Sequence, residues 1–224
     1  MGSALAQELA ARGFRVLGTG RRAATDLPPG HALDRYLQAD LSRPDDVARF
    51  ADWATARSGG RLDVAVLNAG LGYYRPLTAE TAADIARVLG VNLDAPIQLA
   101  HALRPALSGG AMGLVGSVAH RGAAVMPVYA ASKGALDGFG RALAEEWRGD
   151  VRVRVLHPGP VATGMSERAG RPRNLMDSLF LSPRAVAITL LDALLARRGP
   201  DRQVISFLRV GRAAVLRGLT AGGR

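Results

Sequence analysis

The stretch GSVAHRGAAVMPVYAASKGA, from 116 to 135, contains the run Tyr129-Ala-Ala-Ser-Lys133, with Ser117 twelve positions before the tyrosine. Tyr129 and Lys133 are four residues apart, so in a helix they share one face, one turn from each other. A phenol has a reference pKa of about 10, and a neighbouring cation favours its ionised form. We therefore predict that Lys133 lowers the pKa of Tyr129 and that the tyrosine acts as a general acid or base.

The lysine of this pair is unusual for the chain. Lysine and arginine together number 29, and Lys133 is the single lysine. Arginine carries a planar guanidinium that stays charged, whereas lysine carries a compact ammonium whose pKa shifts readily on burial. We interpret the lysine as a chemical requirement of this position. Taken alone, the five-residue run leaves open that Tyr129 is an ordinary helix aromatic.

Composition limits the classes of protein to consider. The chain has 224 residues, 48% hydrophobic and 21% charged, which is typical of one globular domain. It has no cysteine, which excludes disulfides, zinc–thiolate sites and cysteine nucleophiles, and its histidines lack metal-ligand spacing. No apolar run approaches the roughly 18 residues of a membrane span, and Glu8 interrupts the first segment. We therefore expect a cytoplasmic protein with no metal, membrane span or targeting segment.

The net charge of +10 raises the question of nucleic-acid binding. The arginines are spread along the whole chain, only 5% of residues are aromatic, and no nucleic-acid-binding module accompanies the charge. We therefore expect no nucleic-acid partner. A basic surface also attracts phosphorylated small molecules.

Helix and strand patterns alternate along the chain, which is typical of an α/β fold with a doubly wound parallel sheet. The segments expected to be helical are 3–12, 44–57, 78–103, 127–148 and 182–197. The segments expected to be strands are 14–18, 34–38, 62–67, 112–115, 151–156 and 203–207. A Pro/Gly loop is expected at 28–30, and a basic, weakly amphipathic tail at 209–219 suits a surface or dimer contact better than a membrane surface.

Further motifs follow the expected strands, where ligands bind in open α/β sheets. In chain order the motifs are Asn68-Ala69-Gly70, Asn92, Ser117, the Tyr129–Lys133 pair and Pro158-Gly159-Pro160-Val161-Ala162-Thr163. In this order the motifs resemble the short-chain dehydrogenase/reductase family over essentially the whole chain. The resemblance implies one Rossmann-like domain over 1–224, with a cofactor-binding half at 1–110 and a catalytic and substrate half at 111–224.

The resemblance also implies a role for each motif. Tyr129 exchanges a proton with the substrate oxygen, Ser117 donates a hydrogen bond to that oxygen, and Lys133 contacts the nicotinamide ribose. Asn92 holds a water in a proton relay behind the lysine. Considered separately, Ser117 also suits a helix cap and Asn92 a bend in a helix. The implied cofactor-binding residues are Gly2, Arg21, Arg22, Asp40, Asn68, Ala69, Gly70, Tyr129, Lys133, Pro158, Gly159, Val161 and Thr163.

The choice of cofactor is indicated at the end of the strand near residue 18. Relatives that prefer NAD place an acidic residue there to hold the ribose 2′-hydroxyl. Here the position falls on Gly20, followed by Arg21 and Arg22. Arginine pairs with a 2′-phosphate, so NADP (NADPH) is favoured over NAD, although the two arginines also suit a solvated pair. Asp40 either contacts the adenine edge or caps the turn before the 44–57 helix.

The beginning of the chain departs from the family pattern. The family opens with a strand and Thr-Gly-x-x-x-Gly-x-Gly, whose glycines let the backbone approach a pyrophosphate. Only Gly2 matches, at the last glycine, so the first, central strand and most of this motif are absent. Our hypothesis is that Met1 is an internal methionine and that the chain is truncated at its N-terminus. A sheet without that strand would have two exposed inner edges.

These observations predict an NADP(H)-dependent oxidoreductase that interconverts a ketone or aldehyde and an alcohol on a small organic substrate. The alternative is a non-catalytic nucleotide-sensing or scaffold protein of the same fold, inactive because the phosphate-binding loop is missing. Substrate identity depends on the loops at 71–76, 118–128 and 164–180, where Leu71, Tyr73, Tyr74, Met126 and Met165 suit either a pocket or ordinary packing. By resemblance we expect a homodimer or homotetramer formed through the 78–103 and 127–148 helices.

Overall fold

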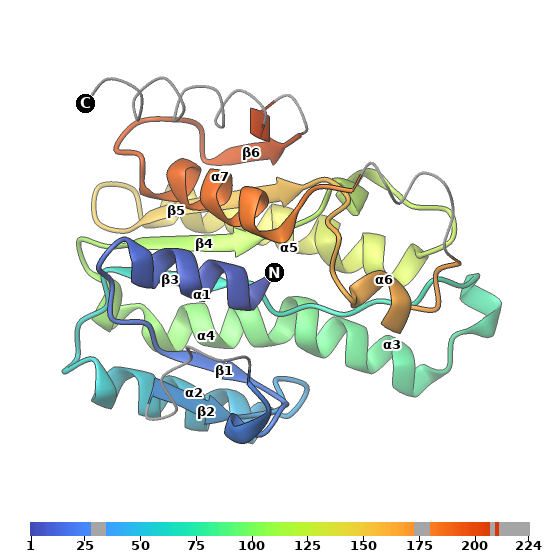
Figure 1. Cartoon of the computed structure of the whole chain (residues 1–224), viewed down its shortest axis with the longest axis horizontal. Coiled ribbons are helices and arrows are strands. Elements are labelled where there is room, and N and C mark those ends of the chain that lie inside the picture. Colours follow the sequence, from blue (N-terminus) through green and yellow to red (C-terminus); the bar gives the residue numbers. More distant parts are fainter. Residues whose placement is uncertain (28–34, 173–179, 207–208, 211–224) are drawn as a thin grey trace.

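The computed structural model describes residues 1–27, 35–172, 180–206 and 209–210. Within these ranges helices alternate with parallel strands (Figure 1), which confirms the predicted α/β fold. The loop expected at 28–30 and nearly all of the 209–219 tail lie outside the described residues.

The elements agree with the predicted ones, with shifts at their ends, except that the helix expected over 78–103 is divided into two helices by a π-helical turn at Gly90–Asp94. The helices are α1 (Gly2–Ala11), α2 (Pro44–Arg57), α3 (Ala82–Leu89), α4 (Ala95–Leu103), α5 (Pro127–Glu146), α6 (Met165–Arg168) and α7 (Pro183–Leu195). The strands are β1 (Gly18–Gly20), β2 (Tyr36–Gln38), β3 (Val64–Leu67), β4 (Ala111–Val115), β5 (Arg152–Pro158) and β6 (Arg202–Ile205). The strand expected at 14–18 forms later because only Gly18–Gly20 lies opposite β2, with Gly18 aligned to Tyr36.

The strands form two separate parallel sheets. One has the order β1-β2 and the other the order β3-β4-β5-β6. In the larger sheet Val64 aligns with Ala111, and Ala111 with Arg152. Among the described residues β1 and β3 each pair on one side only, so each has an open edge, which agrees with the two inner edges expected for this sequence.

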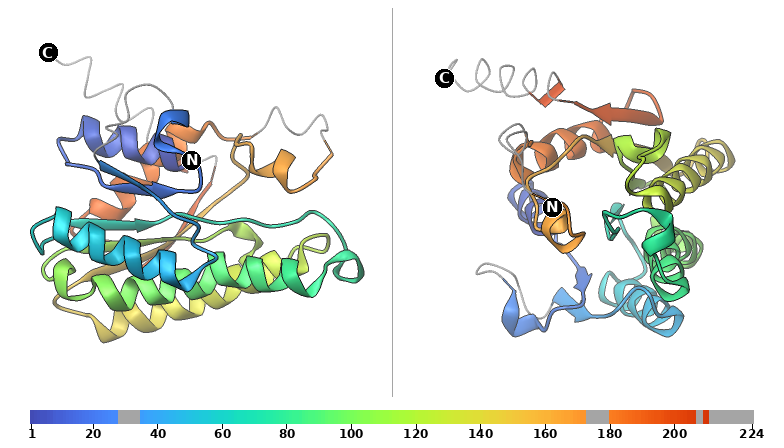
Figure 2. Two further views of the ribbon diagram at one scale, coloured as in Figure 1. Left: turned by 90° about the horizontal axis from the view of Figure 1, so that it is seen from below. Right: turned by 90° about the vertical axis from the view of Figure 1, so that its right-hand side faces the viewer.

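Helices cover both faces of the strands (Figure 2). Helices α1 and α7 pack together on one face, and α2, α4 and α5 lie on the other. Each face has its own apolar core, one that includes Leu99, Leu114 and Leu136, and one that includes Leu5 and Leu190. The small β1-β2 sheet is joined to the rest on the second face, because α2 packs against α4.

Two features describe how α5 and α7 pack against β5. A glycine on α5 allows close packing, because a Cβ at Gly140 would lie 2.3 Å from Val155 Cγ2. On β5, Arg154 is only 1% exposed, although its alternation with apolar residues suggests a solvent-facing side chain. It donates to the carbonyl oxygen of Ala193, and Arg152 donates to that of Leu194. Both arginines thus satisfy carbonyl groups at the C-terminal end of α7.

The described helices carry no membrane signature: none of them combines the length and apolar character that crossing a bilayer requires.

Candidate active site

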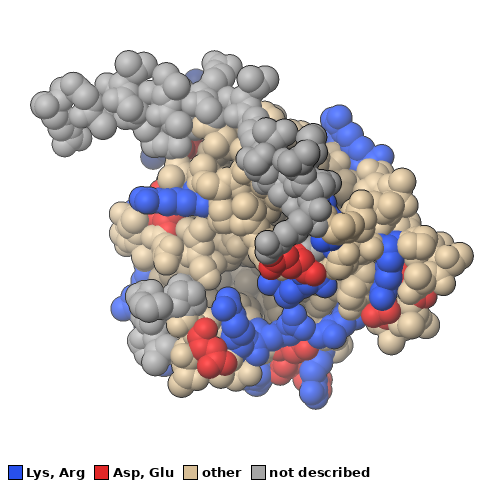
Figure 3. Space-filling view, turned by 45° about the vertical axis from the view of Figure 1, so that its right-hand side comes forward, with Lys and Arg blue, Asp and Glu red and all other residues tan. Residues whose placement is uncertain are grey.

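A cavity of about 890 Å³ opens at the carboxyl ends of β1, β3, β4 and β5. Figure 3 shows a hollow on this side of the molecule, bordered by blue arginine side chains. The cavity contains Ser117, Tyr129 and Lys133 from the predicted catalytic set, and every predicted cofactor-binding residue except Arg22. Residues from both halves of the chain therefore share one wall.

Tyr129 and Ser117 lie together on this wall. Ser117 follows β4, and its Oγ accepts a hydrogen bond from the backbone nitrogen of Ala119 at 3.2 Å. Tyr129 is in the first turn of α5 and shares a side-chain hydrogen bond with Ser117. Glycine is required beside the tyrosine, because a Cβ at Gly72 would lie 2.7 Å from Tyr129 Cδ2. The phenol and the hydroxyl thus lie within hydrogen-bonding distance of each other.

The pKa of Tyr129 shifts in the direction opposite to the one predicted from the sequence. Burial raises the pKa of Tyr129, and the hydrogen bond with Ser117 opposes part of this rise. The ammonium of Lys133 lies 5.9 Å from the centre of the tyrosine ring. Burial is therefore the dominant influence on this pKa, and the phenol is protonated at neutral pH.

Lys133 is buried, with 3% of its surface exposed. Its Nζ donates to the carbonyl oxygen of Val115 on β4 at 2.9 Å. Burial lowers the pKa of Lys133 to about 8, because a low-dielectric environment disfavours the ammonium. An arginine at this position would remain charged. Lys133 therefore lies over the ring of Tyr129, as predicted, and its pKa is closer to neutral pH than that of an ordinary lysine.

Asn92 is fully buried in a π-helical turn, Gly90–Asp94, between α3 and α4. Its Oδ1 accepts from Leu71 N at 2.9 Å, and its Nδ2 donates to Leu71 O at 2.8 Å and to Ser132 Oγ at 2.9 Å. The side chain thus fixes the segment after β3 against α5. π-turns of this kind often occur at functional sites. The amide itself contacts Leu71 and Ser132. The relay water expected at Asn92 remains a prediction.

Arginines and polar groups gather where the cavity meets β1. Arg21 lines the cavity, and the charge of Arg22 acts on the amino group of Met1, whose pKa is lowered by burial, by Arg168 and by Arg22. Asp40 lines the cavity and also accepts from the backbone nitrogen of Ser42 at 3.1 Å. Both interpretations of Asp40 are therefore compatible with its position.

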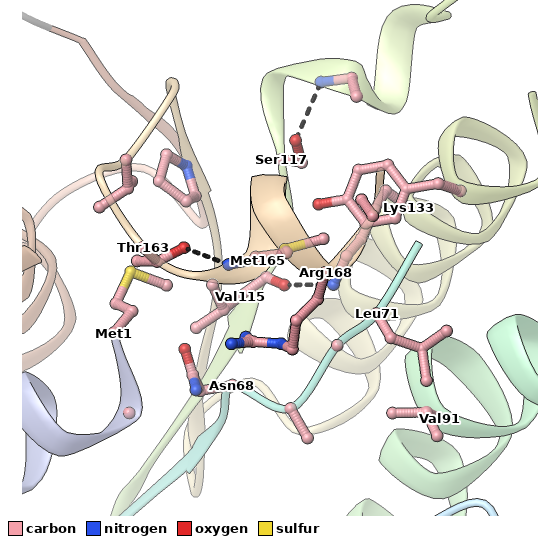
Figure 4. A pocket seen from close by; sticks show the side chains of 18 of the residues that line it. Met1, Asn68, Leu71, Val91, Val115, Ser117, Lys133, Thr163, Met165 and Arg168 are labelled. Atoms are coloured by element: carbon pink, nitrogen blue, oxygen red, sulfur yellow. Dashed lines mark hydrogen bonds between the residues drawn. The ribbon is translucent and has the colours of Figure 1, made fainter. Parts of the chain in front are cut away.

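The middle of the cavity contains one orphaned polar atom. The buried Oδ1 of Asn68 has no hydrogen-bond partner among the described residues, and a Cβ at Gly2 would lie 3.1 Å from Asn68 Nδ2. Figure 4 shows the guanidinium of Arg168, from α6, pointing into the space near Asn68 and Val115. The buried acceptor is suited to a hydroxyl or N–H group of a ligand, and the cation facing the same space is suited to an anionic group.

Arg168 was not predicted from the sequence, because α6 follows a loop whose path is not encoded in any local motif. Phe180 was not predicted either; it lines the cavity with Leu71, Tyr74, Met126 and Met165. These four had been considered as pocket residues, whereas Tyr73 instead has its ring 4.3 Å from the guanidinium carbon of Arg75. Within the described ranges, no group of three or more His, Asp or Glu side chains is arranged to hold a metal ion.

The sequence matches those of known proteins. A model of the short chain dehydrogenase family matches residues 1–174. The chain belongs to the short-chain dehydrogenase family. Among curated members, the chain is 35% identical over 145 residues to a "Cyclic-di-GMP-binding biofilm dispersal mediator protein" of Escherichia coli, covering 62% of this chain and 61% of that protein. It is 32% identical over 181 residues to a tropinone reductase homologue of Arabidopsis thaliana, covering 74% of this chain and 66% of the relative.

A solved structure also matches over nearly its whole length. It is a blue fluorescent protein from a metagenomic library in complex with NADPH, with a TM-score of 0.76 and 29% identity, covering 92% of this chain and 91% of that one. The two curated relatives are longer: the chain spans less than two thirds of the length of each. Membership of the family and its fold are thus established for the region compared.

Proposed function

We propose that this short-chain dehydrogenase is an NADP(H)-dependent oxidoreductase that interconverts a ketone or aldehyde and an alcohol on a small organic molecule. The observation that carries the proposal is the convergence of Ser117, Tyr129 and buried Lys133 on one wall of a cavity whose other end carries arginine. A catalytic acid, its hydrogen-bonding partner and a cation within one apolar cavity are the groups that proton exchange with a carbonyl oxygen requires.

In the proposed mechanism the cofactor, when bound, supplies or accepts the hydride. Tyr129 is protonated at neutral pH because burial raises its pKa, so it can donate a proton to the carbonyl oxygen in the reducing direction. Ser117 donates to the same oxygen and stabilises its developing negative charge. Lys133 stabilises the phenolate that remains, since its ammonium sits one turn away. Asn92 holds Leu71 in place behind these groups.

The residues around the cavity fit a dinucleotide. In our proposal Arg21 and Arg22 pair with a 2′-phosphate, and Asp40 with the Asn68-Ala69-Gly70 segment borders the adenosine. Pro158, at the end of β5, and Gly159, Val161 and Thr163 after it would border the nicotinamide. Gly2 would let the backbone approach the phosphates, and the orphaned Asn68 Oδ1 would accept a hydrogen bond from a hydroxyl or N–H group of the cofactor. The likeness to a structure in complex with NADPH supports this choice of cofactor. It leaves NAD as the alternative to be tested.

The apolar lining of the cavity supports an apolar substrate. Leu71, Met126, Met165 and Phe180 line the same cavity as Tyr129. Such side chains bind carbon skeletons by burying their surface and set few polar requirements. We further propose that the protein acts in the cytoplasm as a homodimer or homotetramer, with the 1–110 half binding the cofactor and the 111–224 half holding the substrate.

A second candidate is a non-catalytic nucleotide-binding protein of the same fold. The division of the strands into two sheets and the printed name of the E. coli relative, which includes cyclic-di-GMP binding, favour it. The two candidates differ in turnover, not in binding.

The experiment that separates them compares Tyr129→Phe with Tyr73→Phe, a control tyrosine whose ring packs on Arg75. NADPH oxidation is followed with a panel of small apolar ketones, and NADPH binding by fluorescence titration. We expect Tyr129→Phe to lose at least about 100-fold in kcat with NADPH affinity unchanged, and the control to keep wild-type rates. Binding of NADPH by a wild-type protein that turns over no carbonyl substrate would favour the second candidate, and equal rates in Tyr129→Phe would contradict the mechanism.

A further inference from the structure

A buried polar cluster lies directly behind Ser117. His157, on β5, is fully buried, and Asp137, on α5, is 6% exposed. The Nε2 of His157 is 2.8 Å from Asp137 Oδ1, and its Nδ1 is 3.1 Å from the carbonyl oxygen of Ser117. Neither side chain is among the residues that line the cavity. The cluster therefore reaches Ser117 from the core side, through its backbone.

The imidazole of His157 is packed tightly against the peptide that precedes Ser117. A Cβ at Gly116 would lie 2.4 Å from His157 Nδ1 and 2.7 Å from Cε1. A glycine at 116 therefore lets the ring come this close to the chain. The contact with the Ser117 carbonyl is a consequence of that approach, and it is not a loose surface interaction.

Both ring nitrogens of His157 face hydrogen-bond acceptors, namely a carboxylate oxygen and a carbonyl oxygen. A neutral imidazole has one N–H and one acceptor nitrogen, whereas the imidazolium has two N–H groups. Only the protonated ring can donate to Asp137 and to Ser117 at once. In the neutral ring, one nitrogen lone pair would point at an oxygen lone pair.

His120 has the opposite arrangement. Its Nδ1 is 2.6 Å from the Ser117 carbonyl oxygen, which calls for an N–H, while its Nε2 faces the Nη2 donor of Arg202. These partners assign a neutral ring with its proton on Nδ1. The His120 and His157 rings lie 4.0 Å apart between centroids. Two imidazoles from different elements therefore converge on one carbonyl oxygen.

The charges around His157 come from two further elements, α5 and β6. Asp137 on α5 accepts from Arg202 Nε of β6 at 2.9 Å and lies 3.4 Å from Arg141 Nε. Burial opposes ionisation of Asp137, but His157 and the two arginines lower its pKa, so it is a carboxylate. Burial lowers the pKa of His157 despite the opposing hydrogen bond with Asp137. The imidazolium is therefore lost as the pH rises through a pKa that lies below the ordinary value of histidine.

We propose that His157, oriented by Asp137, is a positioning residue that holds the peptide of Ser117 through its Nδ1–H and so fixes the Ser117 hydroxyl against Tyr129. The carbonyl oxygen of Ser117 belongs to the same peptide plane as the nitrogen of Val118, which begins the turn Val118–Arg121. Holding this plane fixes both the serine and the start of the loop that forms one side of the cavity. This inference rests on the proposed function.

Three substitutions at position 157 separate positioning from packing. His157→Asn places an amide N–H where Nδ1 stands and keeps the bond to Ser117. His157→Gln places its amide where Nε2 stands, which keeps the bond to Asp137 and loses the one to Ser117. His157→Leu fills the space without donating. At a pH below the pKa of His157, where both ring nitrogens carry a proton, we expect Asn to keep kcat within about threefold of wild type and Gln and Leu to lose about tenfold, with unchanged KM for NADPH.

Two pH-dependent readouts complete the test. Wild-type kcat is expected to fall as the pH rises through the pKa of His157, because the second N–H is lost, whereas His157→Asn does not titrate and should lack this step. The backbone amide resonance of Val118, recorded on the protein without substrate, should show the same step in wild type and not in His157→Asn. This second readout does not depend on turnover, so it remains informative if the proposed reaction is wrong.

The outcomes are distinct. If Asn loses as much kcat as Leu, or if Gln retains wild-type kcat, the bond to Ser117 does not position the residue. A Val118 resonance with no pH step in wild type would also overturn the proposal. Should His157→Leu fail to fold, the comparison of Asn with Gln still decides, because both keep one polar contact and a similar volume.

Discussion

The buried ammonium of Lys133 leads to a prediction about stability. Replacing it by Lys133→Met keeps the length of the side chain and removes the charge. A fall in its pKa from 10.5 to about 8 corresponds to about 3 kcal/mol of lost stability at neutral pH, since the charged group is held in the core. The variant also loses the hydrogen bond to the Val115 carbonyl, which is worth about 1 kcal/mol. We expect the variant to gain about 2 kcal/mol at pH 7.

The pH dependence has a definite sign. Below about pH 8 the lysine is protonated in both the folded and the unfolded protein, so the full cost of burying the charge is present. Between about 8 and 10.5 the unfolded chain binds more protons than the folded one, so wild-type stability rises with pH. The advantage of Lys133→Met should therefore shrink across this range and vanish near pH 10, where the remaining cost of burying the charge equals the contribution of the lost hydrogen bond.

Urea unfolding followed by circular dichroism at pH 7, 8, 9 and 10 measures this difference. At pH 7 the gain corresponds to a rise in Tm of about 4–8 °C for a chain of this size. Arg61→Met, which removes a side chain that is 81% exposed, is the control and should show no such trend. A Lys133→Met difference that stays constant from pH 7 to 10 would refute desolvation of the ammonium. The same variant should lose turnover under the proposed mechanism.

Two further predictions concern glycines. Gly140→Ala should destabilise the protein by about 1–3 kcal/mol, because its Cβ would lie 2.3 Å from Val155 Cγ2. Gly138→Ala, on the same helix, places its Cβ where nothing lies within 4 Å and should stabilise the protein by about 0.5–1 kcal/mol. Thermal unfolding distinguishes the two variants, and equal effects would contradict the packing described. Gly72→Ala should lower kcat by at least about tenfold with little change in NADPH affinity, because its Cβ would displace the Tyr129 ring, and an unchanged kcat would show that the ring position is not critical.

The site could be predicted where it depends on topology. In a parallel sheet the carboxyl ends of neighbouring strands meet at one edge, so Asn68, Ser117 and Pro158 had to lie together once the strands were recognised. The spacing of Tyr129 and Lys133 likewise fixed their common face. Order along the chain was sufficient for both.

What could not be predicted depends on contacts between distant segments. The rise in the pKa of Tyr129 comes from burial, which is supplied by loops far away in sequence. The burial of Arg154 depends on the end of α7 lying above β5, and its alternating pattern in sequence instead suggests exposure. The reach of Arg168 into the cavity and the meeting of His157 with Asp137 depend in the same way on how helices settle on the sheet.

The separation of β1-β2 from the larger sheet has a consequence for how the protein responds to its cofactor. Arg21 and Asp40 belong to the smaller part, and Tyr129 and Lys133 to the larger. Packing of α2 on α4 links the two parts, so the smaller one can open locally without breaking the hydrogen bonds of β3 to β6. A dinucleotide that contacts both parts would link them, and its binding free energy would oppose this local opening. Cofactor binding should therefore slow amide hydrogen exchange most in β1 and β2.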